Sequence, residues 1–129
     1  MKRIEELDAA KRDAVQGKKI TFEDLGINRT FYWAYQYSCE ADTEFLNFDD
    51  VVWEQDVPAI VENCRRFGIN RFTISCGMSS MAELIWTFEQ HSCCLIGMAQ
   101  VNSRFTETTA DWKEKRKILP AFEIRVLPA

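Results

Sequence analysis

The chain alternates between segments whose apolar residues recur at the period of a helix and shorter runs that are apolar throughout or at every second position. Helical spacing predicts a helix over 57–67, with Asp56 as its N-cap and Gly68 as the residue that ends it. The same spacing predicts a helix from Ser80 to residue 90, where Ser80 and Glu83 form a capping box.

Four runs predict β-strands. Residues 29–38 are rich in aromatic, β-forming residues, and alternate side chains make a stripe on one face. The stripe consists of Phe31, Trp33, Tyr35 and Tyr37. We expect it to be core, and an exposed interface is the alternative. Residues 71–75 predict a short strand, 93–101 a central strand covered on both faces, and 121–127 a half-exposed edge strand.

The order of these elements predicts a single small α/β domain over residues 1–129. Two strand–helix–strand units imply three parallel strands joined by right-handed crossovers. The last strand returns through a long hairpin and is expected to be antiparallel. The predicted fold is a four-stranded mixed sheet (three parallel strands plus one antiparallel edge strand) with packed helices. A helix within residues 1–17 is expected to pack at the periphery.

Charge, apolar runs and cysteine content limit the partners and the compartment that we expect for the protein. The 129 residues carry a net charge of −4, which argues against a general attraction to nucleic acid or to anionic membranes. The N-terminus lacks the apolar run of a secretory signal, and no segment reaches the ~18 apolar residues of a membrane span. Five cysteines without regular spacing suit reduced thiols better than a disulfide framework. We therefore expect a cytoplasmic protein without membrane contact.

Three stretches carry a resemblance to a known family: DVPAIVENCRRFGINRFTIS, AELIWTFEQHSCCLIGMAQVN and ILPAFEIRV. Together with the residues between them, they resemble a family of small uncharacterised proteins carried by conjugative and other mobile elements of Firmicutes. The resemblance covers roughly two thirds of the chain. It implies a bacterial cytoplasmic accessory protein, and it implies no reaction.

The segment FTISCGMSSMAELIWTFEQHSCC combines a strand, a turn of small residues, a helix and the only histidine. A helix N-terminus after such a turn offers free backbone N–H groups, which suit a phosphate or a carboxylate. The residues that would hold the anion are Ser75, Gly77, Ser79 and Ser80. A capped turn without a ligand is the alternative, because no nucleotide-binding motif is present.

Neither a nucleophile nor a metal centre is predicted in this segment. Cys76 precedes the helix and His91 follows it, so a helix of about 12 residues would hold them ~18 Å apart. Adjacent Cys93 and Cys94 on a strand point to opposite faces and lack the spacing of zinc ligands. Acidic residues between 42 and 56 are interpreted as a solvated loop. No catalytic residue, metal or cofactor is therefore assigned.

The run DWKEKRKIL is the only basic stretch. Lysines at alternate positions would project from one side of an extended chain and contact phosphates, while a tryptophan stacks on a base. The candidate nucleic-acid contacts are Arg104, Trp112, Lys113, Lys115 and Lys117. A charged hairpin that keeps an edge strand from aggregating is the alternative.

The function that fits best is a non-enzymatic binding or regulatory protein that acts through contacts with an unidentified protein. Two alternatives stay open: a nucleic-acid accessory protein using the 104–117 hairpin, and a small enzyme or anion binder at the 75–80 turn. A homodimer is a further option. Clustering of Arg104 with the lysines would favour the first alternative. A deep pocket beside the turn, at the carboxyl ends of parallel strands, would favour the second.

Overall fold

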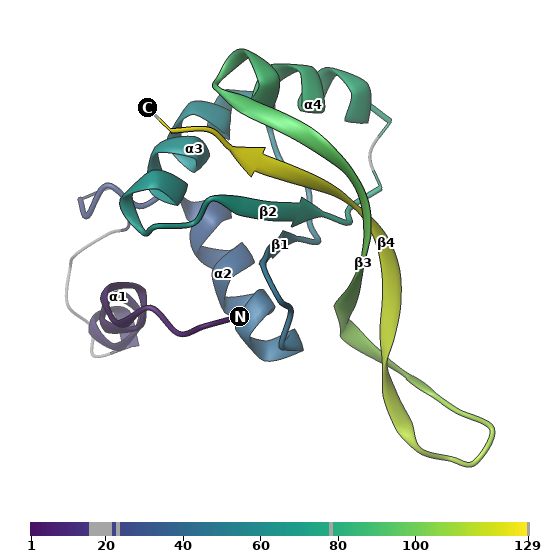
Figure 1. Ribbon diagram of the computed structural model, residues 1–129. Coiled ribbons are helices and arrows are strands. Elements are labelled where there is room, and N and C mark those ends of the chain that lie inside the picture. Colours follow the sequence, from purple (N-terminus) through teal and green to yellow (C-terminus); the bar gives the residue numbers. More distant parts are fainter. Residues whose placement is uncertain (16–21, 23, 78, 129) are drawn as a thin grey trace.

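A computed structural model describes residues 1–15, 22, 24–77 and 79–128, and arranges their helices around one sheet (Figure 1). In chain order the elements are α1 (Glu5–Val15), α2 (Arg29–Ala41), β1 (Leu46–Phe48), the 3-10 turn η1 (Glu54–Asp56), α3 (Val57–Arg66), β2 (Arg71–Ile74), α4 (Met81–Gln90), β3 (Cys93–Thr108) and β4 (Glu114–Val126). The predicted α/β class is confirmed. Helices α3 and α4 and strand β2 lie within one residue of their predicted bounds.

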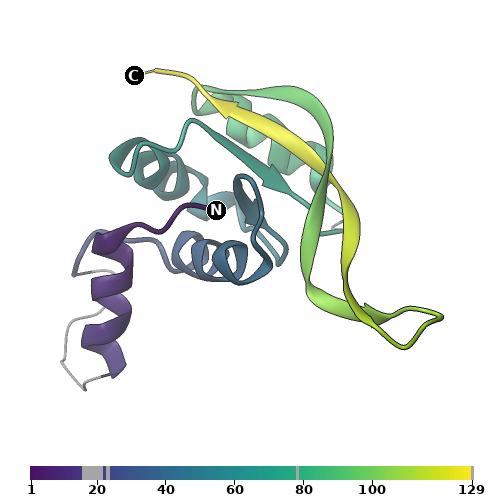
Figure 2. The same cartoon turned by 60° about the horizontal axis from the view of Figure 1, so that its bottom comes forward.

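The sheet has the strand order β1-β2-β4-β3. Strands β1 and β2 pair in parallel, whereas β4 pairs antiparallel with β2 on one side and with β3 on the other. The mixed four-stranded sheet is thus confirmed, but its predicted arrangement is wrong in two respects. Only one pair of neighbours is parallel, and β4 rather than residues 93–101 takes an inner position. β3 is an edge strand that continues with β4 as a long hairpin projecting from the body (Figures 1 and 2).

The alternating pattern of β4 explains its inner position. Ile124 and Val126 are buried in the core, on the face of the sheet that the helices cover. Glu123 is on the opposite face, where it pairs with Arg71 of β2 at 3.4 Å. The predicted edge position of this strand is wrong, but the inner strand accommodates Pro120, because β2 pairs only with residues 122–125 and the proline pairs with Gln100 of β3.

The predicted strand over 29–38 is wrong, because these residues form helix α2. Asn28 caps the helix by accepting a hydrogen bond from the Phe31 N–H at 3.1 Å. The aromatic stripe consequently splits: Phe31 and Tyr35 are fully buried, whereas Trp33 is 42% exposed. The residues buried on α2 recur at helical spacing, whereas a strand would bury every second residue. They are Phe31, Tyr32, Ala34, Tyr35, Gln36, Ser38 and Ala41.

Strand β1 was not predicted, because its acidic surroundings suggested a loop. Leu46 and Phe48 point into the core, and Asn47 lies on the other face. There the Asn47 Oδ1 accepts a hydrogen bond from the Thr73 hydroxyl at 2.8 Å. Its side-chain amide donates to Ser75 Oγ at 3.0 Å. These contacts join the ends of β1 and β2 and satisfy polar groups that the fold buries.

The N-terminal helix packs more closely than we expected. Leu7 and Ala10 of α1 are buried in the core. The Tyr35 hydroxyl accepts a hydrogen bond from the Ile4 N–H at 2.7 Å and donates one to Asp8 at 3.0 Å. The sequence also predicts that Gly17 ends this helix and that residues 21–26 form one helical turn. Gly17, Thr21 and Glu23 lie outside the described residues.

Two helix ends test the predicted caps. Gly68 has φ +71, and the Ile69 N–H bonds to the Cys64 carbonyl at 2.7 Å, so the predicted glycine stop of α3 is confirmed. Ser80 occupies the N-cap position of α4, but its side chain makes no capping hydrogen bond. The capping box is therefore absent, and Asp56 likewise makes no side-chain cap at α3.

Asn28 and Ser80 occupy the N-cap positions of α2 and α4, and their truncation to alanine should affect stability differently. Asn28→Ala removes a side chain that bonds the first turn of α2 and should lower the free energy of unfolding by ~1 kcal/mol. Ser80→Ala removes no such bond and should change it by less than ~0.5 kcal/mol. Urea denaturation of both variants measures the difference. Equal losses would show that Ser80 caps α4 in solution.

Candidate functional site

The turn between β2 and α4 is already engaged by the fold. The backbone N–H groups of Ser75 and Cys76 both donate to the Phe48 carbonyl, at 2.9 and 3.3 Å. Ser75 Oγ accepts from Asn47, while Gly77 and Ser79 are exposed. The predicted anion-binding residues therefore lie together, but the two backbone donors nearest the strand are used. The anion site stays a prediction, and the packing at this turn lends it no further support.

Cys76 does not have the surroundings of an activated nucleophile. Burial raises the pKa of its thiol, and the nearby carboxylates of Asp50 and Asp49 raise that pKa further. His91 is at the other end of α4, where its Nδ1 lies 2.9 Å from the Thr87 carbonyl. Among the residues that the structure describes, no His, Cys, Asp and Glu side chains form a group of three or more suited to a metal ion.

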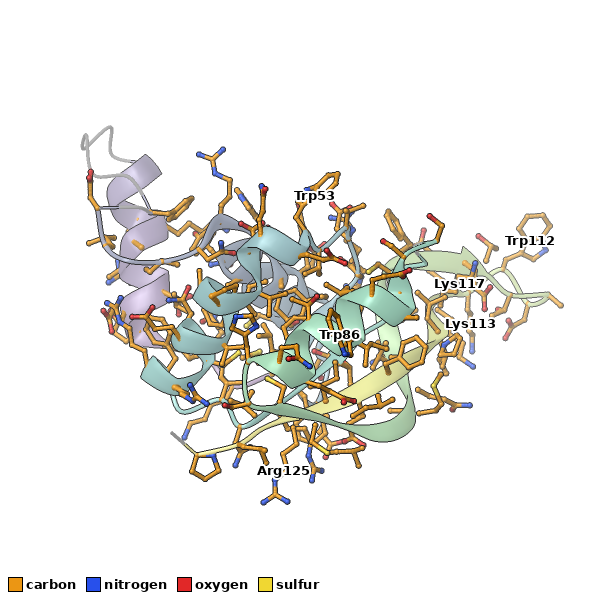
Figure 3. All side chains as sticks on the ribbon, turned by 90° about the horizontal axis from the view of Figure 1, so that it is seen from above. Trp53, Trp86, Trp112, Lys113, Lys117 and Arg125 are labelled. Carbon is orange, nitrogen blue, oxygen red and sulfur yellow. The ribbon has the colours of Figure 1, made fainter. Side chains whose placement is uncertain are left out.

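The lysines of the basic run lie on the projecting hairpin. Trp112 is 88% exposed at its end, and Lys113 and Lys117 lie just behind it (Figure 3). Lys115 is also exposed, directly across from Glu107 on β3. Acidic neighbours thus interrupt the positive surface, as expected for a charged hairpin.

Arg104 does not join these lysines. Its side chain lies over the Tyr37 ring, with the guanidinium carbon 4.0 Å from the ring centroid. Its Nε is 3.4 Å from Asp49 Oδ2. The base of the hairpin is held further by Arg116, which donates to the Arg104 carbonyl at 2.6 Å and to the Glu40 carbonyl at 2.9 Å. Arg104 and Arg116 therefore attach the hairpin to α2 and to the end of β1.

The free edge of β3 is the most unusual surface of the molecule. From Cys93 to Ser103 the strand carries no charged side chain. It is nevertheless largely exposed: Ile96 is 45% and Met98 61% exposed. The strand is paired with β4 on one side and lies at the end of the sheet on the other. An edge strand without charges is a template for pairing with another chain.

The sequence of this edge is a run of apolar residues, which we interpreted as a buried central strand rather than as an exposed edge. The apolar run CCLIGMAQV predicted a strand covered on both faces, whereas most of its side chains contact solvent. Large exposed hydrophobic residues also occur outside β3, among them Trp53 of the β1–η1 segment and Trp86 of α4 (Figure 3). Apolar composition alone does not distinguish a buried strand from an interface.

A protein-family model described as a domain of unknown function (DUF7698) matches residues 30–126. The match runs from α2 to the end of β4 and covers more than half of the chain, so the chain belongs to this family. Comparisons with curated proteins and with solved structures find no match. The expectation of an uncharacterised family is confirmed. In the part of the chain that the structure describes, no helix has the length and apolar character needed to cross a membrane.

The Cys76 thiol should react as a protected side chain. We expect the pH midpoint of its alkylation by iodoacetamide to lie above the ~8.5 of an unperturbed thiol, because burial disfavours the thiolate. Peptide mass spectrometry on the native protein follows each cysteine separately, with exposed Cys94 as the internal comparison. A midpoint below the unperturbed value would restore Cys76 as a nucleophile.

The buried carboxylate of Asp49 should make stability depend on pH. Burial raises its pKa in the folded state, which outweighs the opposing effect of Arg104. A group with a raised folded pKa contributes stability that is present at low pH and is lost as the pH rises through that pKa. The free energy of unfolding of the native protein, minus that of Asp49→Asn, should therefore be larger at pH ~4, close to the unfolded pKa of ~3.9, than at pH ~7.

Urea denaturation at both pH values measures this difference. Glu62→Gln is the control, because Glu62 is an exposed carboxylate on α3 that carries the same charge. A difference that falls with decreasing pH would mean that Arg104 outweighs burial at Asp49.

Proposed function

We propose that this member of the DUF7698 family is a non-enzymatic binding protein, and that it accepts an extended segment of a partner protein along the free edge of β3. One observation carries the proposal: β3 is an edge strand whose residues from Cys93 to Ser103 are uncharged and largely exposed. Strand addition of this kind draws its affinity from main-chain hydrogen bonds and its specificity from alternate side chains.

The geometry of β3 suggests which residues would pair with the partner. Register shifts interrupt the β3–β4 ladder between Leu95 and Gly97 and again between Asn102 and Thr106. Between them the pairing is regular from Gly97 to Asn102, which is the length of an average strand. Met98 projects here into solvent, so the favoured partner is an extended segment with apolar residues at every second position.

Proteins protect open edges with charges, bulges or covering loops. Here the shift at Ile96 is a bulge-like irregularity, and the charges of the hairpin begin only at Arg104. The stretch from Gly97 to Asn102 carries neither a charge nor a register shift, which favours an interface over a solvated edge.

The alternatives have less support. A nucleic-acid contact would rely on Lys113, Lys115 and Lys117 without Arg104, which is held by Asp49 and Tyr37. An anion site at residues 75–80 would lie close to the carboxylates of Asp49 and Asp50, which would repel it. We also propose a bacterial cytoplasmic setting, as an accessory protein of a mobile element. The resemblance in sequence and the five free cysteines support that setting.

Charges placed on the edge should abolish binding. We expect the native protein to capture a partner from an extract of its host, and the double variant Met98→Lys, Gln100→Lys to lose it, because lysines on an edge strand oppose strand addition. Both residues are exposed, so the substitutions should leave the fold intact. The captured protein, once identified, is then titrated against both forms by calorimetry.

The control is the double variant Trp112→Lys, Ile118→Lys. It has the same change in charge and also removes large exposed apolar residues, but from the hairpin end and β4. It should bind as the native protein does. Sedimentation velocity of the native protein tests the homodimer: a dimer that the edge lysines dissociate would assign the edge to self-association and contradict a separate partner. Equal loss in both double variants would contradict the edge itself.

A further inference from the structure

A cavity of about 260 Å³ lies between α2 and the segment that follows β1. Three aromatic residues contribute to its walls, and two consecutive carboxylates follow directly from the end of β1. Among the residues that line the cavity are Trp33, Tyr37, Phe48, Asp49 and Asp50. The cavity is at the carboxyl end of the parallel pair β1–β2, the end at which open α/β sheets bind ligands.

Asp49 lacks a hydrogen-bond partner on one side. Its side chain is only 7% exposed. Arg104 Nε lies 3.4 Å from Oδ2 as an ion pair, and neither that Nε nor the buried Oδ1 has a hydrogen-bond partner in another described residue. A buried acceptor left without a donor costs ~1–3 kcal/mol, so a donor that enters the cavity would regain that free energy. Asp49 therefore indicates a ligand that donates a hydrogen bond.

The charges around the cavity favour a cation. Every charged residue between positions 30 and 64 is acidic. Burial is the main cause that raises the pKa of Asp49, and the carboxylates of Asp50 and Glu40 lie close enough to raise it further. Arg104 offsets one carboxylate and exposed Arg29 lies at the rim. Because these two arginines already offset part of the negative charge, a single positive charge suits the cavity better than two.

The aromatic walls favour an organic cation over a metal ion. The rings of Trp33 and Tyr37 stack with their centroids 5.9 Å apart. Aromatic faces attract ammonium groups and also cover the apolar body that carries them. A metal ion would need several oxygen ligands in a shell around it, and the cavity offers two carboxylates on one wall.

We propose that this cavity binds a monovalent organic ammonium ion, with Asp49 Oδ1 accepting a hydrogen bond from the ammonium group and the Trp33 and Tyr37 rings covering its apolar body. The volume is at the small end of ligand sites, so the ligand is a small alkyl or aryl amine, or the end of a lysine side chain. Both sources present the same chemistry. This site is separate from the β3 edge, and its test does not depend on that edge.

The probe is phenethylammonium, titrated into the isotope-labelled full chain and followed by amide resonances. We expect saturable shifts centred on Trp33, Tyr37 and residues 49–51, with Kd ~1 mM, a value typical of a ligand of this size. Neutral phenethyl alcohol should bind at least ~10-fold more weakly, because it cannot form the ion pair. Equal binding of the alcohol and the amine would overturn the proposal, and so would shifts elsewhere or no shifts at ~10 mM.

Two variants assign the contacts. Asp49→Asn keeps the size of the side chain and should weaken phenethylammonium binding at least ~10-fold. Glu62→Gln removes one negative charge from an exposed position on α3 and should leave binding unchanged. If Asp49→Asn unfolds, Trp33→Ala supplies the second test, because Trp33 is partly exposed and forms the aromatic wall. Unchanged affinity in Trp33→Ala, or equal losses in Asp49→Asn and Glu62→Gln, would reject the site.

A second probe identifies the source of the ammonium group. Nα-acetyl-lysine methylamide binding more tightly than phenethylammonium would point to a lysine side chain of a protein, and the reverse order to a free amine. Failure of both probes would reject the ammonium site and leave strand addition at β3 unaffected.

Discussion

The fold depends on the insertion of the last strand, β4, between β2 and β3. Ile124 and Val126 fill the core behind it, and its backbone satisfies hydrogen bonds on both sides. This insertion moves β3 to the edge of the sheet. The longest apolar run of the chain consequently lies where one side of its backbone has no neighbouring strand, and the surface chemistry of the molecule follows from that position.

Apolar periodicity and a helix-ending glycine were sufficient to predict helices α3 and α4 from the sequence. Gly68, with its positive φ, ends α3 as the sequence indicated, and the periodic apolar residues of α3 and α4 gave both helices. Aromatic residues at 31 and 35 fit both a two-residue and a helical period, so α2 was mistaken for a strand. Tertiary contacts decide for the helix: Tyr32 and Ala34 are buried along with Phe31, which a strand with one covered face would not permit.

Strand order could not be predicted in the same way, because it depends on contacts between distant segments. An apolar strand such as β3 is compatible with the centre of a sheet and with an exposed interface, and its sequence does not distinguish them. The alternating residues of β4 suggested a half-exposed strand, and Pro120 suggested an edge. They are instead compatible with an inner strand whose second face is polar, where Glu123 meets Arg71. Cross-strand pairs of this kind appear only once the register is known.

The candidate sites depend on the same long-range contacts. Asp49 belonged to an acidic segment interpreted as solvated, and Arg104 to a basic hairpin, yet folding places these two side chains against each other and over Tyr37. Arg104 belongs to β3, only two residues beyond the regular stretch Gly97–Asn102. Arg104 therefore anchors the hairpin that carries the free edge to the wall of the separate cavity, where its Nε is 3.4 Å from Asp49 Oδ2. The other oxygen receives no hydrogen bond from another described residue, and this asymmetry is the reason we propose a cation as the ligand of the cavity.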